Sequence, residues 1–102
     1  MFARVLTFQF QANPELEAQM QKLEQEFMPV LREQKGFVKL YELLDRVNGK
    51  GLQIHFWETE ADLLAYLNGP VAKDRQSYIQ TLLKDQITTP PKGEHYEVVG
   101  QS

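Results

Sequence analysis

The sequence contains no cysteine and only two histidines, His55 and His95. The lack of cysteine excludes a disulfide framework, a thiolate zinc site and a cysteine nucleophile. Two histidines are too few for a metal centre built from histidine, although a site assisted by carboxylates stays open. We therefore expect a protein that holds no metal.

An excess of basic residues and long apolar runs are also missing. Eleven Lys and Arg residues against fourteen Asp and Glu residues give a formal net charge of −3. Nucleic acids and anionic membranes attract a basic face, so we expect neither as a partner. No stretch approaches the roughly 20 apolar residues that cross a bilayer. Gln9 and Gln11 interrupt the apolar start too early for a signal peptide, and we expect a cytoplasmic protein.

The length and composition fit a small folded protein. A chain of 102 residues leaves room for one domain, which we expect to span residues 1–102. The hydrophobic share of 42% and the charged share of 25% are ordinary for a soluble globular fold and argue against disorder.

The first part of the chain predicts a strand followed by a helix. Phe8 and Phe10 alternate with polar residues, a period of two that indicates a strand. Asn13 and Pro14 are typical of a helix N-cap and first helical position. Apolar residues then recur at steps of three and four, which predicts one buried helical stripe, with charged neighbours such as Glu24 facing water. The stripe consists of Leu16, Met20, Leu23, Phe27 and Leu31.

Proline and glycine mark where this helix ends. Pro29 is expected to kink or end it near Met28, because proline removes a helical hydrogen bond. Gly36 suits the left-handed conformation that follows a helix C-terminus. Strands are then expected over residues 37–47 and 52–58, joined by a tight turn at Asn48 and Gly49.

The second half of the chain repeats the pattern. Thr59 and Asp62 resemble a capping box that opens a helix, and Gly69 and Pro70 interrupt it. A second helical stretch follows, with Arg75 on its polar side. Residues 87–93, which include two consecutive prolines, are expected to form a loop, and residues 95–100 a short final strand.

The order is β-α-β-β-α-β, which predicts an α+β, ferredoxin-like fold with a four-stranded antiparallel sheet. Right-handed crossovers place the first and third strands at its centre. Helices cover only one face of such a sheet, yet both parities of the strands carry large apolar residues. One expected face holds Leu6, Phe8, Phe10, Leu52, Ile54 and Phe56, and the other holds Val5, Val38, Leu40, Trp57 and Val99.

An uncovered apolar face of several hundred Å² usually marks an interface. We therefore expect a homodimer in which two copies pack through their sheet faces, related by a twofold axis. The alternative is a monomer with an apolar face.

Several segments resemble the antibiotic biosynthesis monooxygenase family. They are Leu31-Arg-Glu-Gln-Lys-Gly36-Phe37, the turn at Asn48-Gly49, and Ile54-His-Phe-Trp57-Glu-Thr-Glu-Ala-Asp-Leu63. In that family a helix ends in Gly followed by an apolar residue, and a later strand ends in Trp before the cap of the next helix. The resemblance covers about residues 2–100 and implies a dimeric α+β barrel.

The family includes cofactor-independent oxygenases of polyketide quinols, haem-degrading enzymes and quinol-oxidising enzymes. The haem-degrading members carry an axial-ligand histidine on the helix after the Trp. Here no histidine occurs between Thr59 and Gln86, and Gln76 stands near that place. We therefore expect no haem and, for the leading hypothesis, no cofactor.

His55 and Glu42 are the candidate catalytic residues. A two-residue turn would place Glu42 opposite His55 and Leu40 opposite Trp57, whereas a three-residue turn would move Glu42 to the other face. A carboxylate beside an imidazole raises the histidine pKa and fixes its tautomer, as a general base requires. The alternative is a cross-strand polar pair at a strand edge or dimer seam.

Five further residues are candidates for binding a substrate. Trp57 would form an apolar wall, with Gln53 and Leu40 beside the catalytic pair on the same side of the hairpin. Thr7 and Gln9 are polar residues on a central strand and would meet a ligand, water or the dimer mate. Arg4 requires a carboxylate or solvent, so an intersubunit salt bridge and a substrate clamp are equal alternatives.

These residues predict a small-molecule-binding dimeric barrel, with one pocket per subunit between sheet and helices. The leading hypothesis is a cofactor-free monooxygenase in which His55, aided by Glu42, deprotonates an aromatic or quinol-like substrate that then reacts with oxygen. One alternative is a non-catalytic barrel that binds a ligand or a protein. Another is an isomerase or decarboxylase that uses the same base.

Overall fold

The structure is a computed structural model that describes residues 1–11, 14–83 and 87–102. Four strands form one sheet in the order β2-β3-β1-β4, with all neighbours antiparallel. The elements in chain order are β1 (Phe2–Phe10), α1 (Pro14–Arg32), β2 (Phe37–Asp45), β3 (Lys50–Trp57), α2 (Glu60–Leu67), α3 (Pro70–Leu83) and β4 (Ile87–Glu97). The predicted α+β fold, with the first and third strands central, is confirmed, and the expected N-cap at Asn13 lies outside the described residues.

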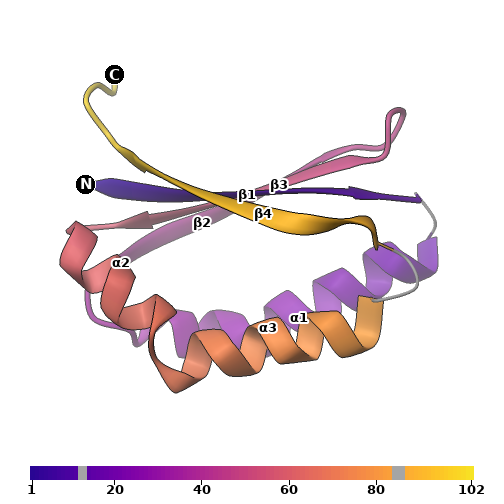
Figure 1. The fold of residues 1–102 in the computed structure, drawn as a ribbon, viewed down its shortest axis with the longest axis horizontal. Coiled ribbons are helices and arrows are strands. Elements are labelled where there is room, and N and C mark those ends of the chain that lie inside the picture. Colours follow the sequence, from indigo (N-terminus) through magenta and orange to yellow (C-terminus); the bar gives the residue numbers. More distant parts are fainter. Residues whose placement is uncertain (12–13, 84–86) are drawn as a thin grey trace.

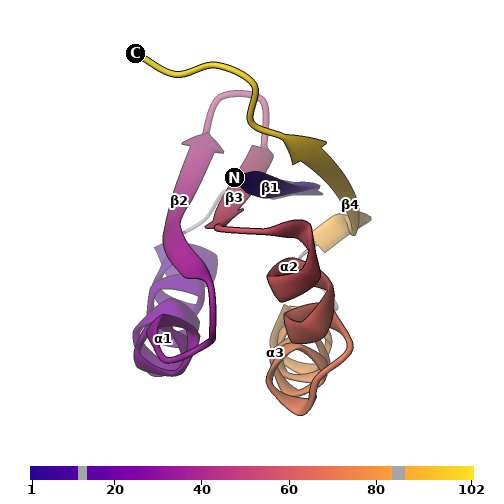
Figure 2. The ribbon, with the colours of Figure 1, turned by 90° about the vertical axis from the view of Figure 1, so that its left-hand side faces the viewer.

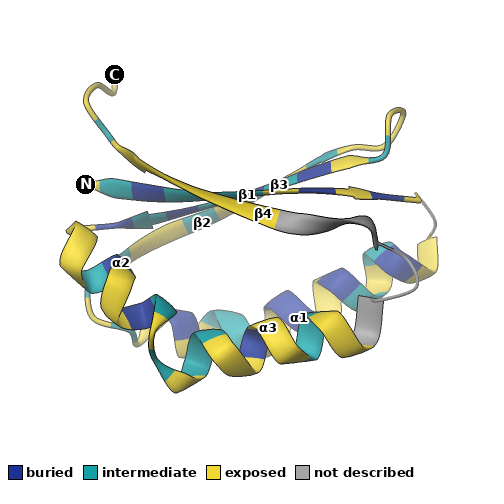
Figure 3. Cartoon of the chain, viewed as in Figure 1, coloured by how far each residue is buried: buried dark blue, intermediate teal, exposed yellow. Residues whose placement is uncertain are grey.

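All three helices lie against the same side of the sheet, and the other side is uncovered (Figures 1 and 2). Buried residues, dark blue in Figure 3, recur along β1, β3 and the helices, as expected for residues that fill the space between the two layers. Two apolar clusters fill that space. One contains Phe8, Phe10, Leu16 and Met20, and the other contains Leu31, Trp57, Leu63 and Tyr66.

Pro29 lies inside α1, so the expected end of the helix near Met28, one of the two outcomes that the sequence predicted, is wrong. The helix continues to Arg32, which places Leu31 in the second apolar cluster with no exposed surface. Burying a leucine side chain contributes about 1.5–3 kcal/mol, which offsets the hydrogen bond that proline removes. Gly36 then adopts the predicted left-handed conformation, with φ of 81°.

The predicted loop over residues 87–93 is part of β4, so that prediction is wrong. Proline lacks the N–H that a central strand needs, but an edge strand requires only half of its backbone groups for the sheet. β4 is an edge strand, and its pairing with β1 shifts register between Thr7 and Phe10, which accommodates Pro90 and Pro91. The expected strand at residues 95–100 ends earlier, at Glu97.

The helices in the second half of the chain begin where the sequence predicts. Thr59 is extended and its Oγ1 accepts a hydrogen bond from the backbone N–H of Asp62 at 3.1 Å, as an N-cap does. Gly69 and Pro70 separate α2 from α3.

The turn between β2 and β3 differs from the expected two-residue turn. Asp45 pairs with Lys50, so four residues connect the strands. The carboxylate of Asp45 fixes this turn, because it accepts hydrogen bonds from the backbone N–H groups of Val47 and Asn48, both at 3.2 Å. Gly49 has φ of 66°, a conformation that glycine adopts without strain.

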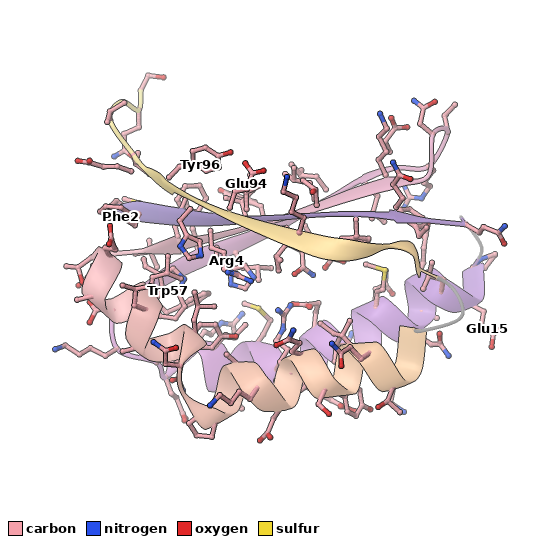
Figure 4. All side chains as sticks on the ribbon, in the orientation of Figure 1. Phe2, Arg4, Glu15, Trp57, Glu94 and Tyr96 are labelled. Atoms are coloured by element: carbon pink, nitrogen blue, oxygen red, sulfur yellow. The ribbon has the colours of Figure 1, made fainter. Side chains whose placement is uncertain are left out.

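The uncovered face of the sheet is apolar, but its composition differs from both predicted sets. Val5 pairs with Ile54 across β1 and β3, so these two point to the same side. Half of the surface of Tyr41, Leu43 and Tyr96 is exposed there, and Figure 4 shows Tyr96 and Glu94 on the side away from the helices. The uncovered apolar residues are Val5, Tyr41, Leu43, Leu52, Ile54, Phe56 and Tyr96.

Candidate functional site

A group of charged and polar side chains is buried between the sheet and the helices. Arg75 of α3 forms an ion pair with Glu24 of α1, and both residues are buried. Gln53 of β3 joins them, because its Nε2 donates to Glu24 Oε1 at 3.3 Å and its Oε1 accepts from Arg75 Nη2 at 3.1 Å. We call Glu24, Glu42, Gln53, His55, Tyr66 and Arg75 the polar cluster.

Helical periodicity explains why two charged residues point inward. Glu24 follows Met20 by four residues and therefore lies on the buried stripe of α1. Arg75 follows Val71 by four residues and lies on the inner face of α3 in the same way. The prediction that Glu24 and Arg75 face water is wrong. Their four-residue spacing from Met20 and Val71 could have indicated that they point inward.

Glu42 lies opposite Gln53, and Leu40 lies opposite His55. The predicted pairing of Glu42 with His55 is therefore wrong, because the four-residue turn shifts the register by two positions. A shift of two residues preserves the face, so Glu42 still points toward the helices.

Burial, and secondarily the charge of Glu24, raises the pKa of Glu42 to about 7. Arg75 and a hydrogen bond from Gln53 oppose this shift but do not cancel it. Glu42 therefore gains and loses its proton near neutral pH, which is the range that a general base requires.

His55 is almost fully buried, with 1% of its surface exposed. Burial, and then the positive charges of Arg75 and Arg4, lowers the pKa of His55 to about 3. The imidazole is consequently neutral at physiological pH, in contrast to the raised pKa that a carboxylate partner would produce. A neutral imidazole donates one hydrogen bond and accepts another.

Aromatic side chains form one wall next to the polar cluster. The ring of Trp57 stacks on that of Tyr66, with centroids 4.9 Å apart, and meets Phe37 edge-on at 5.4 Å. The rings of His55 and Tyr66 lie 6.5 Å apart. Burial raises the pKa of the Tyr66 hydroxyl, so it is a hydrogen-bond donor at neutral pH.

Five buried polar atoms of these residues have no hydrogen-bond partner within the described part of the chain. Leaving such an atom unpaired costs about 1–3 kcal/mol, so buried polar atoms are normally paired. Such atoms retain the capacity to form a hydrogen bond. The five are Oε2 of Glu24, Nδ1 and Nε2 of His55, Nε1 of Trp57 and Nε of Arg75.

Arg4 of β1 points to the same side as the polar cluster. It pairs with His55 on β3 and with His95 on β4, so the two histidines flank it across the sheet. Its Nη1 lies 2.9 Å from Nε2 of His95. Figure 4 shows Arg4 and Trp57 on the helix side of the sheet, opposite to Tyr96.

Five of the seven predicted site residues share the helix-facing side of the β2–β3 hairpin: Leu40, Glu42, Gln53, His55 and Trp57. Thr7 and Gln9 do not join them. Both are exposed, and both line a concavity of about 500 Å³ on the sheet near the turn. Sequence reasoning missed Glu24 and Arg75.

No three His, Asp or Glu side chains within residues 1–11, 14–83 and 87–102 come together as a metal site would require. Among the described helices, none is both long and apolar enough to span a bilayer.

No known family model matches the sequence, and no curated protein sequence matches it. Solved structures do share its fold. A candidate antibiotic biosynthesis monooxygenase from Deinococcus radiodurans is 19% identical, with a TM-score of 0.75 over 100% of this chain and 95% of that one. SnoaB from Streptomyces nogalater, a cofactor-independent oxygenase, is 16% identical, with a TM-score of 0.73 over 98% and 94%.

NE2512 from Nitrosomonas europaea, a protein of unknown function, is 18% identical, with a TM-score of 0.70 over 99% of this chain and 91% of that one. The resemblance to antibiotic biosynthesis monooxygenases is thus confirmed at the level of the fold. A shared fold does not fix the chemistry, which depends on the residues of the site.

Proposed function

We propose that the protein binds a small aromatic or quinol-like molecule beside the polar cluster and oxidises it with molecular oxygen, without a metal or flavin. The observation that carries this proposal is a set of buried polar atoms that have no partner among the described residues and lie next to the wall of Trp57 and Tyr66. Ligand sites typically combine apolar and aromatic walls with a few polar groups that fix orientation. The fold shared with SnoaB adds support by analogy.

Glu42 is the better candidate for the base, and His55 takes a different role. With a pKa of about 7, the Glu42 carboxylate accepts a proton from a phenolic or activated carbon acid at neutral pH. His55, with a pKa of about 3, is too weak a base for this step. As a neutral imidazole it would orient the substrate by hydrogen bonding.

Arg75 and Tyr66 would stabilise the substrate anion that forms when the proton leaves. Arg75 has a buried Nε without a partner among the described residues, and Tyr66 carries its proton at neutral pH. Donors that are fixed before the reaction stabilise developing negative charge most effectively in a site with little water.

The oxygen step consumes only the substrate and dioxygen. The carbanion form of an activated CH₂ group transfers its electrons to O₂, and a carbon–oxygen bond forms. The resulting hydroperoxide loses water, so one oxygen atom becomes the new carbonyl and the other leaves as water with the two hydrogens of the CH₂ group. The substrate carbon is oxidised and O₂ is reduced.

A homodimer through the uncovered sheet face is part of the same proposal. Seven apolar residues from all four strands gather on that face, and a second copy would remove them from water. A face that packs on its own copy about a twofold axis needs no further partner. The dimer would hold the sheet rigid behind the polar cluster.

Oxygen uptake tests the catalytic proposal. The purified protein is incubated with a panel of quinols and hydroxyaromatics in an oxygen electrode, beside the Glu42→Gln and His55→Ala variants and a Glu58→Gln control on the surface. We expect uptake by the wild type and the control with at least one substrate, weaker uptake by His55→Ala, and uptake about 100-fold slower by Glu42→Gln. If no compound gives uptake above Glu42→Gln but one binds saturably, the non-catalytic barrel replaces the oxygenase.

A further inference from the structure

The charges around the polar cluster do not balance. Arg75 is paired with Glu24, whereas Arg4 forms no ion pair with any carboxylate in the described residues. The two groups whose charges affect the pKa of Arg4 are Tyr66, which is neutral at pH 7, and Arg75, which is itself positive. Arg4 is thus a half-buried guanidinium without a negative partner.

The sheet holds Arg4 in this position from both sides. His95 on β4 lies within hydrogen-bond distance of its Nη1, and His55 is its cross-strand neighbour on β3. Gly93 lies against the guanidinium, because a Cβ atom at that position would approach Nη2 of Arg4 to 2.8 Å. A side chain at residue 93 would displace Arg4, so glycine there keeps the guanidinium in place.

The charge of Arg4 also acts on His55, because it contributes to the low pKa of that imidazole. Glu42 does not compensate Arg4, because the charges that shift its pKa are those of Glu24 and Arg75.

We propose that Arg4 is a specificity-determining residue that selects a ligand carrying one negative charge, a carboxylate or phenolate attached to an aromatic ring. The guanidinium fork matches two oxygens of a carboxylate, while the ring would contact Trp57 and Tyr66. This inference rests on the proposed function for the position of the ligand, and it adds the chemical class of that ligand.

A matched pair of probes tests the charge selectivity. The probes are 1-hydroxy-2-naphthoate, which is anionic at pH 7, and 1-hydroxy-2-naphthamide, which has the same ring and no charge. Binding is followed without oxygen by quenching of Trp57, the single tryptophan of the chain. For the wild type we expect the acid to bind about tenfold more tightly than the amide, as a charge-assisted pair of this strength implies.

Variants assign the selectivity to Arg4. In Arg4→Met the acid should bind about tenfold more weakly and the amide unchanged, because only the charged partner is lost. Arg4→Lys should keep part of the preference. Arg46→Met, which removes an exposed arginine from the turn between β2 and β3, should behave like the wild type.

Equal binding of acid and amide to the wild type would overturn the inference, and this result does not depend on any variant folding. A preference that persists in Arg4→Met, or no binding of the acid at millimolar concentration, would also overturn it. Charge-selective binding without oxygen uptake by any substrate would keep the anion site and reject the oxygenase, so the two proposals fail separately.

Discussion

Arg75 and Glu24 form an ion pair that joins α3 to α1 beneath the sheet, and Gln53 of β3 hydrogen-bonds to both of them. These three contacts connect the two helices to a central strand beside the place where we propose that the ligand binds.

Removing one partner of the Arg75–Glu24 ion pair should lower the stability of the folded protein. Arg75→Met leaves the Glu24 carboxylate buried without its cation, so we expect a loss of about 3 kcal/mol or more in the free energy of unfolding. The double variant Glu24→Leu, Arg75→Met should recover much of that loss, because neither charge is left buried. Urea denaturation monitored by circular dichroism measures both, with Arg46→Met as an exposed control close to the wild type. A double variant no more stable than the single one would contradict this account.

His55 should make the protein sensitive to acid. Its pKa is about 3 in the folded protein and about 6.5 when unfolded, so below pH 6.5 only the unfolded chain takes up the proton. The stability from this group is present above pH 6.5 and is lost as the pH falls toward 3. His55→Gln should therefore show a shallower decrease in melting temperature than the wild type between pH 6.5 and 4. Equal slopes for His55→Gln and the wild type would show that His55 does not titrate in this way.

The uncovered sheet face can be tested by placing a charge on it. Ile54→Lys puts an ammonium group at the centre of the proposed interface, where burial without a partner is unfavourable. We expect the wild type to elute as a dimer in size exclusion with light scattering and Ile54→Lys as a folded monomer. Gln80→Lys, which adds the same single charge on the exposed surface of α3, serves as the control for the charge change. A wild type that stays monomeric at micromolar concentration would exclude the dimer.

The fold followed from the sequence because periodicity, caps and turn residues agreed with one another. Thr59 and Asp62 predicted a helix start that the structure contains. The strand at Pro90 and Pro91 could not be predicted, since only its position at the sheet edge makes two prolines acceptable. The patterns that predict helices and strands involve residues close in the sequence. The edge position of β4 depends on how all four strands assemble.

The site was predictable only in part. Trp57, His55 and Gln53 follow from the alternation of one strand, and their shared face is as expected. The pairing of Glu42 depended on the length of the turn, which the side chain of Asp45 sets at four residues. Glu24 and Arg75 were predicted to face water because charged residues are rarely buried. Their burial becomes possible because they form an ion pair with each other between two helices.

The central claim is that Glu42 is the base of an oxygen-consuming reaction. It is tested most directly by the pH dependence of oxygen uptake in the wild type, Glu42→Gln and the surface control Glu58→Gln. We predict that the wild-type rate rises with pH through a midpoint near 7, that Glu58→Gln follows the same curve, and that Glu42→Gln loses about 100-fold in rate together with the midpoint. A Glu42→Gln variant with the wild-type rate and pH profile would contradict the claim.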